Sequence, residues 1–474
     1  MITNLTLLAL LLVTGTSLNA QLTYPVTKKI NQVDEYFGIK VEDPYRWLEN
    51  DSSVEVKNWV QEQNKVSGTY LSQIPYREKI KQKIRDLNDV PYFTAPRQVG
   101  EYYFYFHNTG LQPQDVIYRQ KGLNGKPELF IDPNTLSVDG TTSVNLSDYS
   151  EDKKYITTIT RKAGSDWADI NVLEVATGRK MQDELKWVKN TNISWKGNGF
   201  YYSGYPSVRS EEALSVKNVN QKVYFHQLGT DQQQDQLIFE DKTNPLTFNS
   251  ASCTEDKRFL FIYSFSGNNN TDIYYRDFES PDTTKKLLVK GMDNVFESVM
   301  TNNGDKLIFK TNRNASNGKI VLLDPKNPDP QEWQTLLGEK PELLQTANVS
   351  GGKLFVKYLK DVTSKVYQDT YGGRLEKEIT LPDLGTANGF NGLETDSITF
   401  YGFSSFLYPY TIFKYNIKTG VSEKHYTMNM KMKAEHYETK QVFYSSKDGT
   451  KVPMFIVSKK GSKQDGSHPT LLNA

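Results

Sequence analysis

The side chains that most often carry covalent or proton-transfer chemistry are sparse in this 474-residue sequence. It contains one cysteine, Cys253, and five histidines: His107, His226, His425, His436 and His468. No two of these histidines stand at a metal-ligand spacing, and no serine occupies the Gly-x-Ser-x-Gly pattern of a nucleophile elbow. The phosphate-loop, His-Glu-x-x-His and Cys-x-x-Cys patterns are also missing. The residue types alone therefore indicate no active site, no metal site and no cofactor.

The lone cysteine and the histidines are predicted to be structural. A single cysteine allows no intrachain disulfide, so the fold must depend on burial of apolar surface. Cys253 precedes the apolar run from Phe259 to Tyr263 and has no flanking histidine, which favours a small core residue beside a strand over a nucleophile.

Charge and composition exclude some functions and favour a class of fold. The 57 Lys and Arg residues nearly cancel the 56 Asp and Glu residues, so no global field attracts nucleic acid or an anionic membrane. The 29 Tyr, 23 Phe and 6 Trp residues favour pleated, half-buried surfaces, and therefore strands.

The first 20 residues have the pattern of an export signal. The apolar run Leu5–Val13 is roughly half the length of about 20 residues that a membrane-spanning helix needs, and small residues follow it. We expect cleavage after Ala20 and an exported protein, periplasmic or extracellular, without an integral membrane segment.

Residues 21–90 are predicted to be helical. Asp43 and Pro44 suit an N-cap and the first position of a helix. Val54, Val56, Trp59, Val60 and Val66 then recur at helix-like intervals. A second amphipathic stretch, residues 75–87, carries Ile80, Ile84 and Leu87 on one side. Its basic residues alternate with acidic ones, so a solvated face is favoured over a nucleic-acid stripe.

Residues 91–430 repeat one unit seven times. A tight turn followed by an apolar strand occurs at intervals of about 50 residues, at Gly100, Asp152, Asn198, Asp256, Asp305, Gly352 and Asp396. Each unit has room for about four short strands, which is one blade of a β-propeller. The regular period favours a seven-bladed propeller over a β-sandwich.

From about residue 431 the period ends and a different sheet begins. Residues 441–444 and 451–456 read as two strands joined by an Asp-Gly turn, and residues 469–472 as a third strand. We expect residues 431–474 to be the first strands of a sheet that continues beyond this sequence, as if the chain were truncated.

Seven sequence words, in order along the chain, resemble the prolyl oligopeptidase family of serine peptidases, and prolyl endopeptidases in particular. They are VEDPYRWLE (41–49), YFYFHNTGLQ (103–112), FIDPNTL (130–136), GSDW (164–167), HQLGTD (226–231), FSSFL (403–407) and SKDGTKVPMFIV (446–457).

The resemblance implies a mainly β protein in which a seven-bladed propeller is inserted into an α/β-hydrolase domain. Residues 21–90 and 431–474 would be parts of that hydrolase domain, which is incomplete here. In such enzymes a Ser, a His and an Asp cleave short peptides after proline, and the propeller restricts access. Short proline-containing peptides are thus the implied partners, and we expect a monomer.

The resemblance transfers no catalytic residue to this sequence. The family's oxyanion tyrosine and its Ser, Asp and His lie beyond the strand that matches residues 469–472, so the chain alone is predicted to be inactive. Phe248 aligns where the family places a large apolar side chain near the proline pocket, although a blade-core role is favoured for it; Asn190, where some relatives carry an aromatic residue, is assigned no role. The alternative function is a non-catalytic propeller that binds peptides or a protein partner.

Overall fold

The computed structural model describes residues 22–50, 53–206, 218–267, 270–291, 295 and 297–473. The predicted export signal, residues 1–20, lies outside these ranges. The chain divides into two compact units: the described residues up to Ile84 belong to the first, and those from Arg85 onward belong to the second.

A β-hairpin precedes the helices in the N-terminal part, where only helix was predicted. Strand β1 (Val33–Tyr36) pairs with β2 (Ile39–Glu42) through a two-residue turn. Both turn residues, Phe37 and Gly38, have positive φ angles of 53° and 80°. This is the backbone twist that favours tight hairpins, and it overrides the helical prediction for these residues.

The first long helix begins later than Asp43. Asp43 instead closes a turn: its carboxylate accepts the Tyr45 N–H at 3.3 Å and the Arg46 Nε–H at 2.7 Å, and only the 3₁₀ helix η1 (Arg46–Glu49) follows. Helix α1 (Val54–Ser72) has Ser53 as its N-cap, with Oγ accepting the Val56 N–H at 3.1 Å. The predicted second helix is α2 (Arg77–Asn88).

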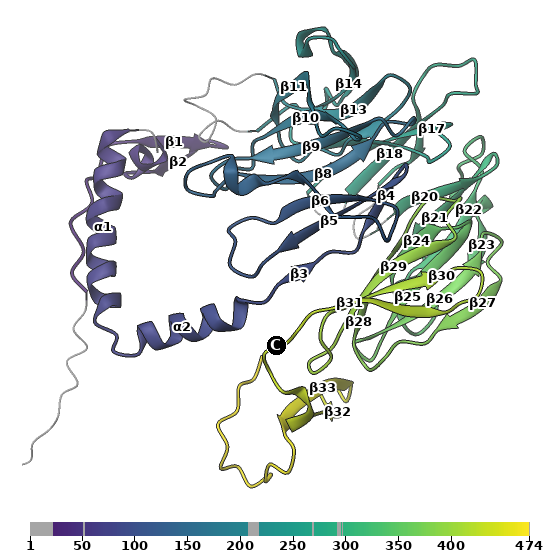
Figure 1. Cartoon of the computed structure of the whole chain (residues 1–474). Helices are drawn as coiled ribbons and strands as arrows, with labels where there is room; N and C mark the ends of the chain where they lie inside the picture. The colour runs from purple at the N-terminus through teal and green to yellow at the C-terminus, as the bar shows by residue number, and fades with distance from the viewer. Residues whose placement is uncertain are drawn as a thin grey trace, which may run out of the picture. The chain divides into compact units, whose positions relative to one another are not determined.

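Seven antiparallel sheets form the blades of a propeller (Figure 1). Blade 1 contains β3 (Tyr92–Phe93), β4 (Arg97–Val99), β5 (Tyr102–Asn108), β6 (Val116–Lys121) and β7 (Glu128–Ile131). Blade 2 contains β8 (Ser143–Tyr149), β9 (Tyr155–Arg161), β10 (Ala168–Glu174) and β11 (Lys180–Val188). Blade 3 contains β12 (Ser194–Trp195), β13 (Gly199–Gly204), β14 (Lys222–Gln227) and β15 (Gln236–Glu240).

The remaining four blades have four strands each. Blade 4 contains β16 (Phe248–Cys253), β17 (Phe259–Ser266), β18 (Asn270–Asp277) and β19 (Lys286–Val289). Blade 5 contains β20 (Glu297–Asn303), β21 (Lys306–Thr311), β22 (Lys319–Leu323) and β23 (Gln334–Leu337). Blade 6 contains β24 (Leu343–Ser350), β25 (Lys353–Lys360), β26 (Thr363–Thr370) and β27 (Leu375–Ile379). Blade 7 contains β28 (Thr386–Asn391), β29 (Ile398–Ser404), β30 (Thr411–Asn416) and β31 (Ser422–Thr427).

The sequence repeat and the blades coincide. Six of the seven predicted turn residues lie between the first and second strands of a blade, the last being Asp396 between β28 and β29. Gly100 lies between β4 and β5 of blade 1, where β3 and β4 both pair with β5 and together take the place of a first strand. Short 3₁₀ helices, η2 (Pro133–Thr135), η4 (Gln232–Gln234) and η5 (Pro330–Glu332), lie within the loops. The predicted seven-bladed propeller is therefore confirmed.

Aromatic side chains fill the space within and between blades. The largest fully buried side chains include Trp195, Tyr202, Tyr401 and Tyr415. One core cluster joins Phe259 and Phe261 of blade 4 to Leu307 and Phe309 of blade 5. Full burial of a large apolar side chain contributes roughly 1.5–3 kcal/mol, so these clusters stabilise the ring of blades without a disulfide.

Blades 1 and 7 meet without exchanging a strand. All strands of blade 1 come from the start of the propeller and all strands of blade 7 from its end. The Tyr426 hydroxyl donates to the Pro91 carbonyl at 2.8 Å, and its ring packs edge-on against Phe93 at 4.9 Å. Side-chain contacts, and no shared sheet, thus hold this junction.

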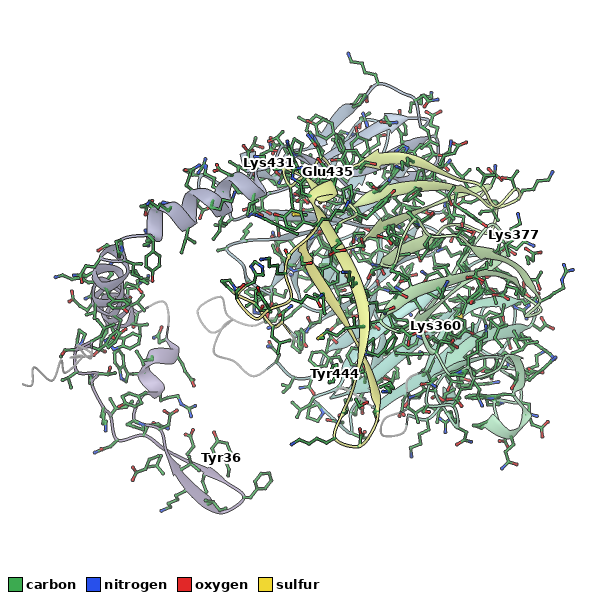
Figure 2. The ribbon with its side chains drawn as sticks, turned by 90° about the horizontal axis from the view of Figure 1, so that it is seen from below. Tyr36, Lys360, Lys377, Lys431, Glu435 and Tyr444 are labelled. Carbon is green, nitrogen blue, oxygen red and sulfur yellow. The ribbon has the colours of Figure 1, made fainter. Side chains whose placement is uncertain are left out.

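The predicted hairpin after the propeller is present, but the predicted third strand is not. After the short helix η6 (Ala434–His436), β32 (Tyr437–Ser445) pairs with β33 (Lys451–Lys459) in a two-stranded sheet, whose tip carries Tyr444 (Figure 2). Residues 469–472 have no regular structure, and Leu471 and Leu472 are 93% and 79% exposed. An apolar segment forms a strand only when a neighbouring strand supplies hydrogen bonds, and this sheet pairs only β32 with β33.

Candidate functional site

Neighbouring strands of each blade run antiparallel, so the turns that join them alternate between the two ends of the propeller axis. The first strands of successive blades contact one another, β8 with β12 and β12 with β16, and also β20 with β24 and β24 with β28, so they lie nearest the axis. The turns between first and second strands all lie at one end, which we call the turn end. The starts of the first strands and the turns between second and third strands lie at the other end, which we call the entry end.

Phe248, the one residue predicted to lie near substrate, is at the entry end. It begins β16 and is half-buried, and its ring stacks on Phe265 of the paired strand β17 at 5.5 Å. Its neighbour Asn249 is buried and donates twice to Gln221, from its backbone N–H to the side-chain oxygen and from its side-chain amide to the carbonyl, at 2.7 Å each. The Phe248 ring therefore packs within blade 4, its neighbour Asn249 is tied to Gln221, and part of the ring stays accessible.

The hairpin β32–β33 packs at this same end of the propeller. The side-chain amide of Gln441 donates to the Asp361 carbonyl in the β25–β26 turn at 2.6 Å. Phe455 packs against Phe406, in the β29–β30 turn, at 5.4 Å. Both turns join second to third strands, so the sheet that begins at the hairpin lies at the end where Phe248 is found.

A contact crosses the axis at the turn end. Both carboxylate oxygens of Glu255, in blade 4, accept the Glu394 N–H of blade 7, at 2.9 and 3.0 Å. Partial burial raises the pKa of Glu255, and the negative charges of Glu394 and Asp396 raise it further. The turn between β28 and β29 thus reaches across to blade 4.

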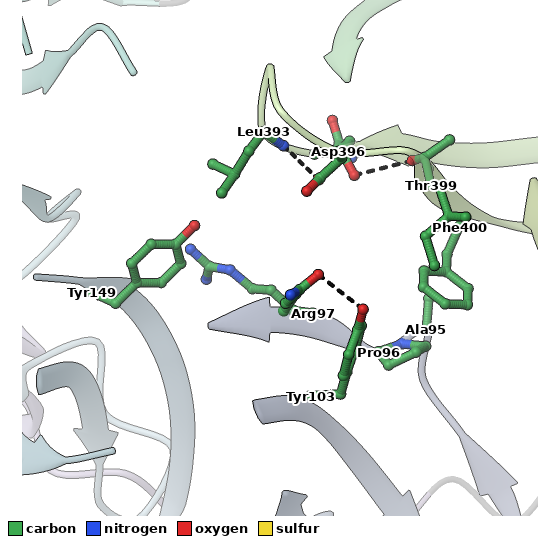
Figure 3. A pocket seen from close by; sticks show the side chains of 14 residues that line it. Ala95, Pro96, Arg97, Tyr103, Tyr149, Leu393, Asp396, Thr399 and Phe400 are labelled. Atoms are coloured by element: carbon green, nitrogen blue, oxygen red, sulfur yellow. Dashed lines mark hydrogen bonds between the residues drawn. The ribbon is translucent and has the colours of Figure 1, made fainter. Parts of the chain in front are cut away.

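A pocket of about 490 Å³ lies beside this contact, between blades 1 and 7 (Figure 3). Arg97 of β4 lies over the Tyr149 ring at 4.9 Å and is 3.7 Å from the Asp148 carboxylate. The Tyr103 hydroxyl donates to the Gln98 side chain at 2.9 Å. The walls combine these groups with Asp396 and the apolar ring of Phe400.

Backbone geometry shapes the pocket wall that blade 7 supplies. Asp396 accepts the Leu393 N–H at 2.7 Å, and burial raises the pKa of its carboxyl group. A Cβ atom on Gly392 would collide with the Ser350 hydroxyl and the Asp396 carboxylate, so the turn requires glycine there. The pocket offers hydrogen bonds and charge of both signs, which suits binding of a polar ligand.

The only fully buried histidine is a structural residue. His226 is 1% exposed, and its ring nitrogens lie 2.7 Å from Asp235 and 3.1 Å from Asp183. Burial alone would lower the pKa of His226, but the hydrogen bonds and charges of Asp235 and Asp183 outweigh it and raise the pKa. Both nitrogens are occupied, so His226 cannot act as a base on a neighbouring serine.

Two other histidines and the cysteine that were predicted to be structural also pack against the protein. His107 stacks on Phe93 at 4.2 Å and His425 packs edge-on against Phe400 at 5.2 Å; burial lowers the pKa of both. Burial also raises the pKa of the Cys253 thiol to about 11, which makes it a poor nucleophile. Across the ranges that the structure describes, no group of three His, Cys, Asp or Glu side chains is placed to hold a metal ion.

Sequence reasoning did not find the pocket or the cross-axis contact. Phe248 lies at the opposite end from both. Arg97, Tyr149 and Asp396 are brought together from blades 1, 2 and 7, and Glu255 and Glu394 are 139 residues apart. The signal in the sequence was limited to the predicted turns at Asp256, which Glu255 precedes, and at Asp396.

The ring of seven blades, followed by a two-stranded hairpin at its entry end, defines a seven-bladed β-propeller with appended strands. Residues 24–427 match the family described as "Prolyl oligopeptidase, N-terminal beta-propeller domain", and the chain belongs to the prolyl oligopeptidase family. It is 39% identical to the prolyl endopeptidase of Elizabethkingia miricola over 95% of this chain and 64% of that protein. It is 30% identical to prolyl oligopeptidase A of Amanita bisporigera, over 94% of this chain and 64% of that protein.

Solved structures show the same fold. A prolyl endopeptidase studied for inter-domain dynamics in catalysis and specificity matches with a TM-score of 0.83 and 31% identity, over 94% of this chain and 65% of that one. Prolyl oligopeptidase B of Galerina marginata, bound to a 35mer hydrolysis and macrocyclization substrate, matches with a TM-score of 0.80 and 28% identity, over 93% of this chain and 66% of that one. The chain thus spans about 64% of the length of the Elizabethkingia relative. Within the described ranges, no helix is long and apolar enough to cross a membrane.

Proposed function

We propose that this chain is the propeller-bearing portion of a serine-type prolyl endopeptidase that cleaves short peptides after proline. The observation that carries the proposal is the position of β32–β33 at the entry end, where Phe248 lies. A hydrolase sheet that continues from this hairpin would face Phe248 and the start of each first strand. Substrate held between the two would meet an apolar ring from the propeller.

In this proposal the propeller selects and positions peptides and does no covalent chemistry. The catalytic Ser, Asp and His belong to hydrolase sequence outside this chain, since no Gly-x-Ser-x-Gly occurs in it. A serine attacks the carbonyl carbon of proline, and a histidine takes the serine proton and gives it to the amine that leaves as the peptide bond breaks. Water then hydrolyses the acyl-enzyme, and an aspartate orients the histidine throughout. The chain as given is then inactive alone.

The contact between Glu255 and Glu394 supports entry from one side. It crosses the axis at the turn end, whereas no comparable contact between opposite blades is found at the entry end among the described residues. Short proline-containing peptides would therefore reach the hydrolase from its own side. We further propose that the protein is exported and works as a monomer.

The proposal is tested by two observations on the same gene and chain. The DNA beyond codon 472 should encode a Gly-x-Ser-x-Gly-Gly sequence, and the purified chain should release no chromophore from a Gly-Pro chromogenic substrate. If the protein is instead a non-catalytic propeller, the DNA beyond codon 472 should encode no hydrolase sequence. Calorimetry should then detect binding of proline-containing peptides, and the peptides should stay intact. Hydrolysis by the chain alone would contradict both functions.

A further inference from the structure

A small basic pocket lies between blades 3 and 4, away from the entry end. It measures about 230 Å³, and the charged side chains that line it are Lys196, Arg276 and Lys285. No Asp or Glu is among the described residues of its wall. Lys196 belongs to the turn between β12 and β13, which places the pocket at the turn end.

Two of these cations are held against one aromatic ring. The Lys196 ammonium lies 4.1 Å from the centre of the Phe278 ring, and the Arg276 guanidinium carbon lies 4.7 Å from the same centre. Lys196 also donates to the Lys257 carbonyl at 2.9 Å, which fixes its position. Two like charges at one ring repel each other unless a negative group lies between or beside them.

Arg276 lacks the carboxylate partner that comparable arginines have. Its Nε is buried and makes no hydrogen bond, and no ion pair of Arg276, Lys196 or Lys285 occurs in the part of the chain that the structure describes. By contrast, Arg258 pairs with Asp277 at 3.1 Å and Arg119 with Glu128 at 3.2 Å. A buried N–H without an acceptor reduces the stability of the fold. A negatively charged acceptor bound in the pocket would remove this penalty.

The rest of the wall limits what this acceptor can be. Phe225, Leu237, Ile238 and Leu260 supply apolar surface, and Tyr201 and Gln236 complete the lining. The volume accommodates a small molecule and excludes a folded partner. From the three unpaired cations and the small volume, we propose that this pocket binds a small oxyanion, a phosphate or carboxylate group, with Arg276 as its principal donor.

The proposal is independent of peptidase activity, because the pocket contributes nothing to the entry end. The probe is inorganic phosphate added to the full chain, compared with sodium chloride at equal ionic strength. A ligand that binds only the folded state raises the unfolding temperature, so phosphate should raise it more than chloride. Acetate and citrate, tested in the same way, distinguish a carboxylate preference from a phosphate preference.

Two adjacent lysines provide a matched pair of variants. Lys285 lines the pocket, whereas Lys286 pairs with Asp282 at 3.0 Å outside it, and the Gln substitutions change the net charge equally. K285Q should weaken oxyanion binding by about tenfold, measured by calorimetry, and K286Q should leave it unchanged. R276Q should abolish oxyanion binding. If R276Q does not fold, the comparison of K285Q with K286Q still tests whether the pocket binds the oxyanion.

Two results would overturn the proposal. One is an unfolding temperature that no oxyanion raises beyond the value in chloride. The other is equal oxyanion affinity in K285Q and K286Q, which would indicate a general charge effect. Preference for carboxylates over phosphate would support the pocket and define its ligand class.

Discussion

The carboxylate of Glu255 in blade 4 accepts the backbone N–H of Glu394 in blade 7, so one residue pair joins two blades across the propeller axis. In a ring of seven blades these two are not neighbours. The contact therefore lies over the axis at the turn end, opposite the entry end where Phe248 and the β32–β33 hairpin lie.

The Glu255 carboxyl group should make stability depend on pH. Partial burial and the charges of Glu394 and Asp396 raise its pKa, so the folded state favours the neutral acid. Its contribution to stability is present below the ordinary pKa of 4.5 and is lost as the pH rises through the raised value. E255Q keeps an oxygen acceptor without the charge, so its urea midpoint should exceed that of the parent chain at pH 7 and match it near pH 4.

An exposed glutamate provides the control for this measurement. Glu332 lies in η5, and E332Q should change the urea midpoint equally little at both pH values. A lower midpoint for E255Q than for the parent chain at pH 7 would show that the negative charge itself supports the contact.

Replacement of His226 by phenylalanine should destabilise the propeller strongly. The substitution leaves Asp183 and Asp235 buried without their shared cation, at a cost of about 3–5 kcal/mol. Urea unfolding measures this loss, and H468Q, in the exposed segment after the hairpin, should leave the midpoint unchanged.

The same histidine predicts a second pH effect. Since Asp235 and Asp183 raise the pKa of His226 against the effect of burial, its stabilising charge is fully present below pH 6.5 and is lost as the pH rises through the raised value. The parent chain should lose stability as the pH rises from 6.5 to the raised pKa, and a variant without His226 should lack that part of the pH dependence. Identical pH profiles for the two would contradict a charged His226.

Asp369 in β26 should reduce stability at neutral pH. It is 4% exposed, and burial raises its pKa to about 6. Its contribution is present below pH 3.8 and is lost as the pH rises through about 6, because a buried carboxylate must then ionise. D369N should raise the unfolding temperature at pH 8 and give no gain near pH 4; an unchanged temperature at pH 8 would refute the effect.

Limited proteolysis should trim both ends of the purified chain to a core of about residues 90–430. Apolar side chains of the hairpin, among them Phe443, Tyr444 and Val457, are 43–50% exposed, and only Val56 of α1 is buried. Segments with few buried contacts open readily and are cleaved first. Mass spectrometry of the products tests this, and equal protection of the ends and the blades would contradict it.

Local signals in the sequence were sufficient for the blades and insufficient for the contacts between them. Every turn between a first and a second strand carries a Gly, Asn or Asp residue, types that favour turns, so the seven turns appear directly in the sequence. Asp43 shows the limit of such signals. An aspartate before a proline suits a helix N-cap, but the Asp43 carboxylate closes a turn with Tyr45 and Arg46 instead.

Contacts between residues that are distant in the sequence were not indicated by any short sequence pattern. The pairing of His226 with Asp183 joins blades 3 and 2, and the pocket at Arg97 and Asp396 joins blades 1 and 7. These contacts depend on the order of the blades around the ring and on the register of each sheet. Neither can be predicted from a single short segment of the sequence.

On the proposed function, this chain supplies the propeller and the first hydrolase strands of a prolyl endopeptidase. The most direct measurement joins residues 22–472 to the remaining third of the Elizabethkingia miricola prolyl endopeptidase and follows hydrolysis of a Gly-Pro chromogenic substrate. The hybrid should cleave after proline, and this chain alone should not. Cleavage by this chain alone, or a hybrid that unfolds cooperatively yet cleaves nothing, would contradict the account.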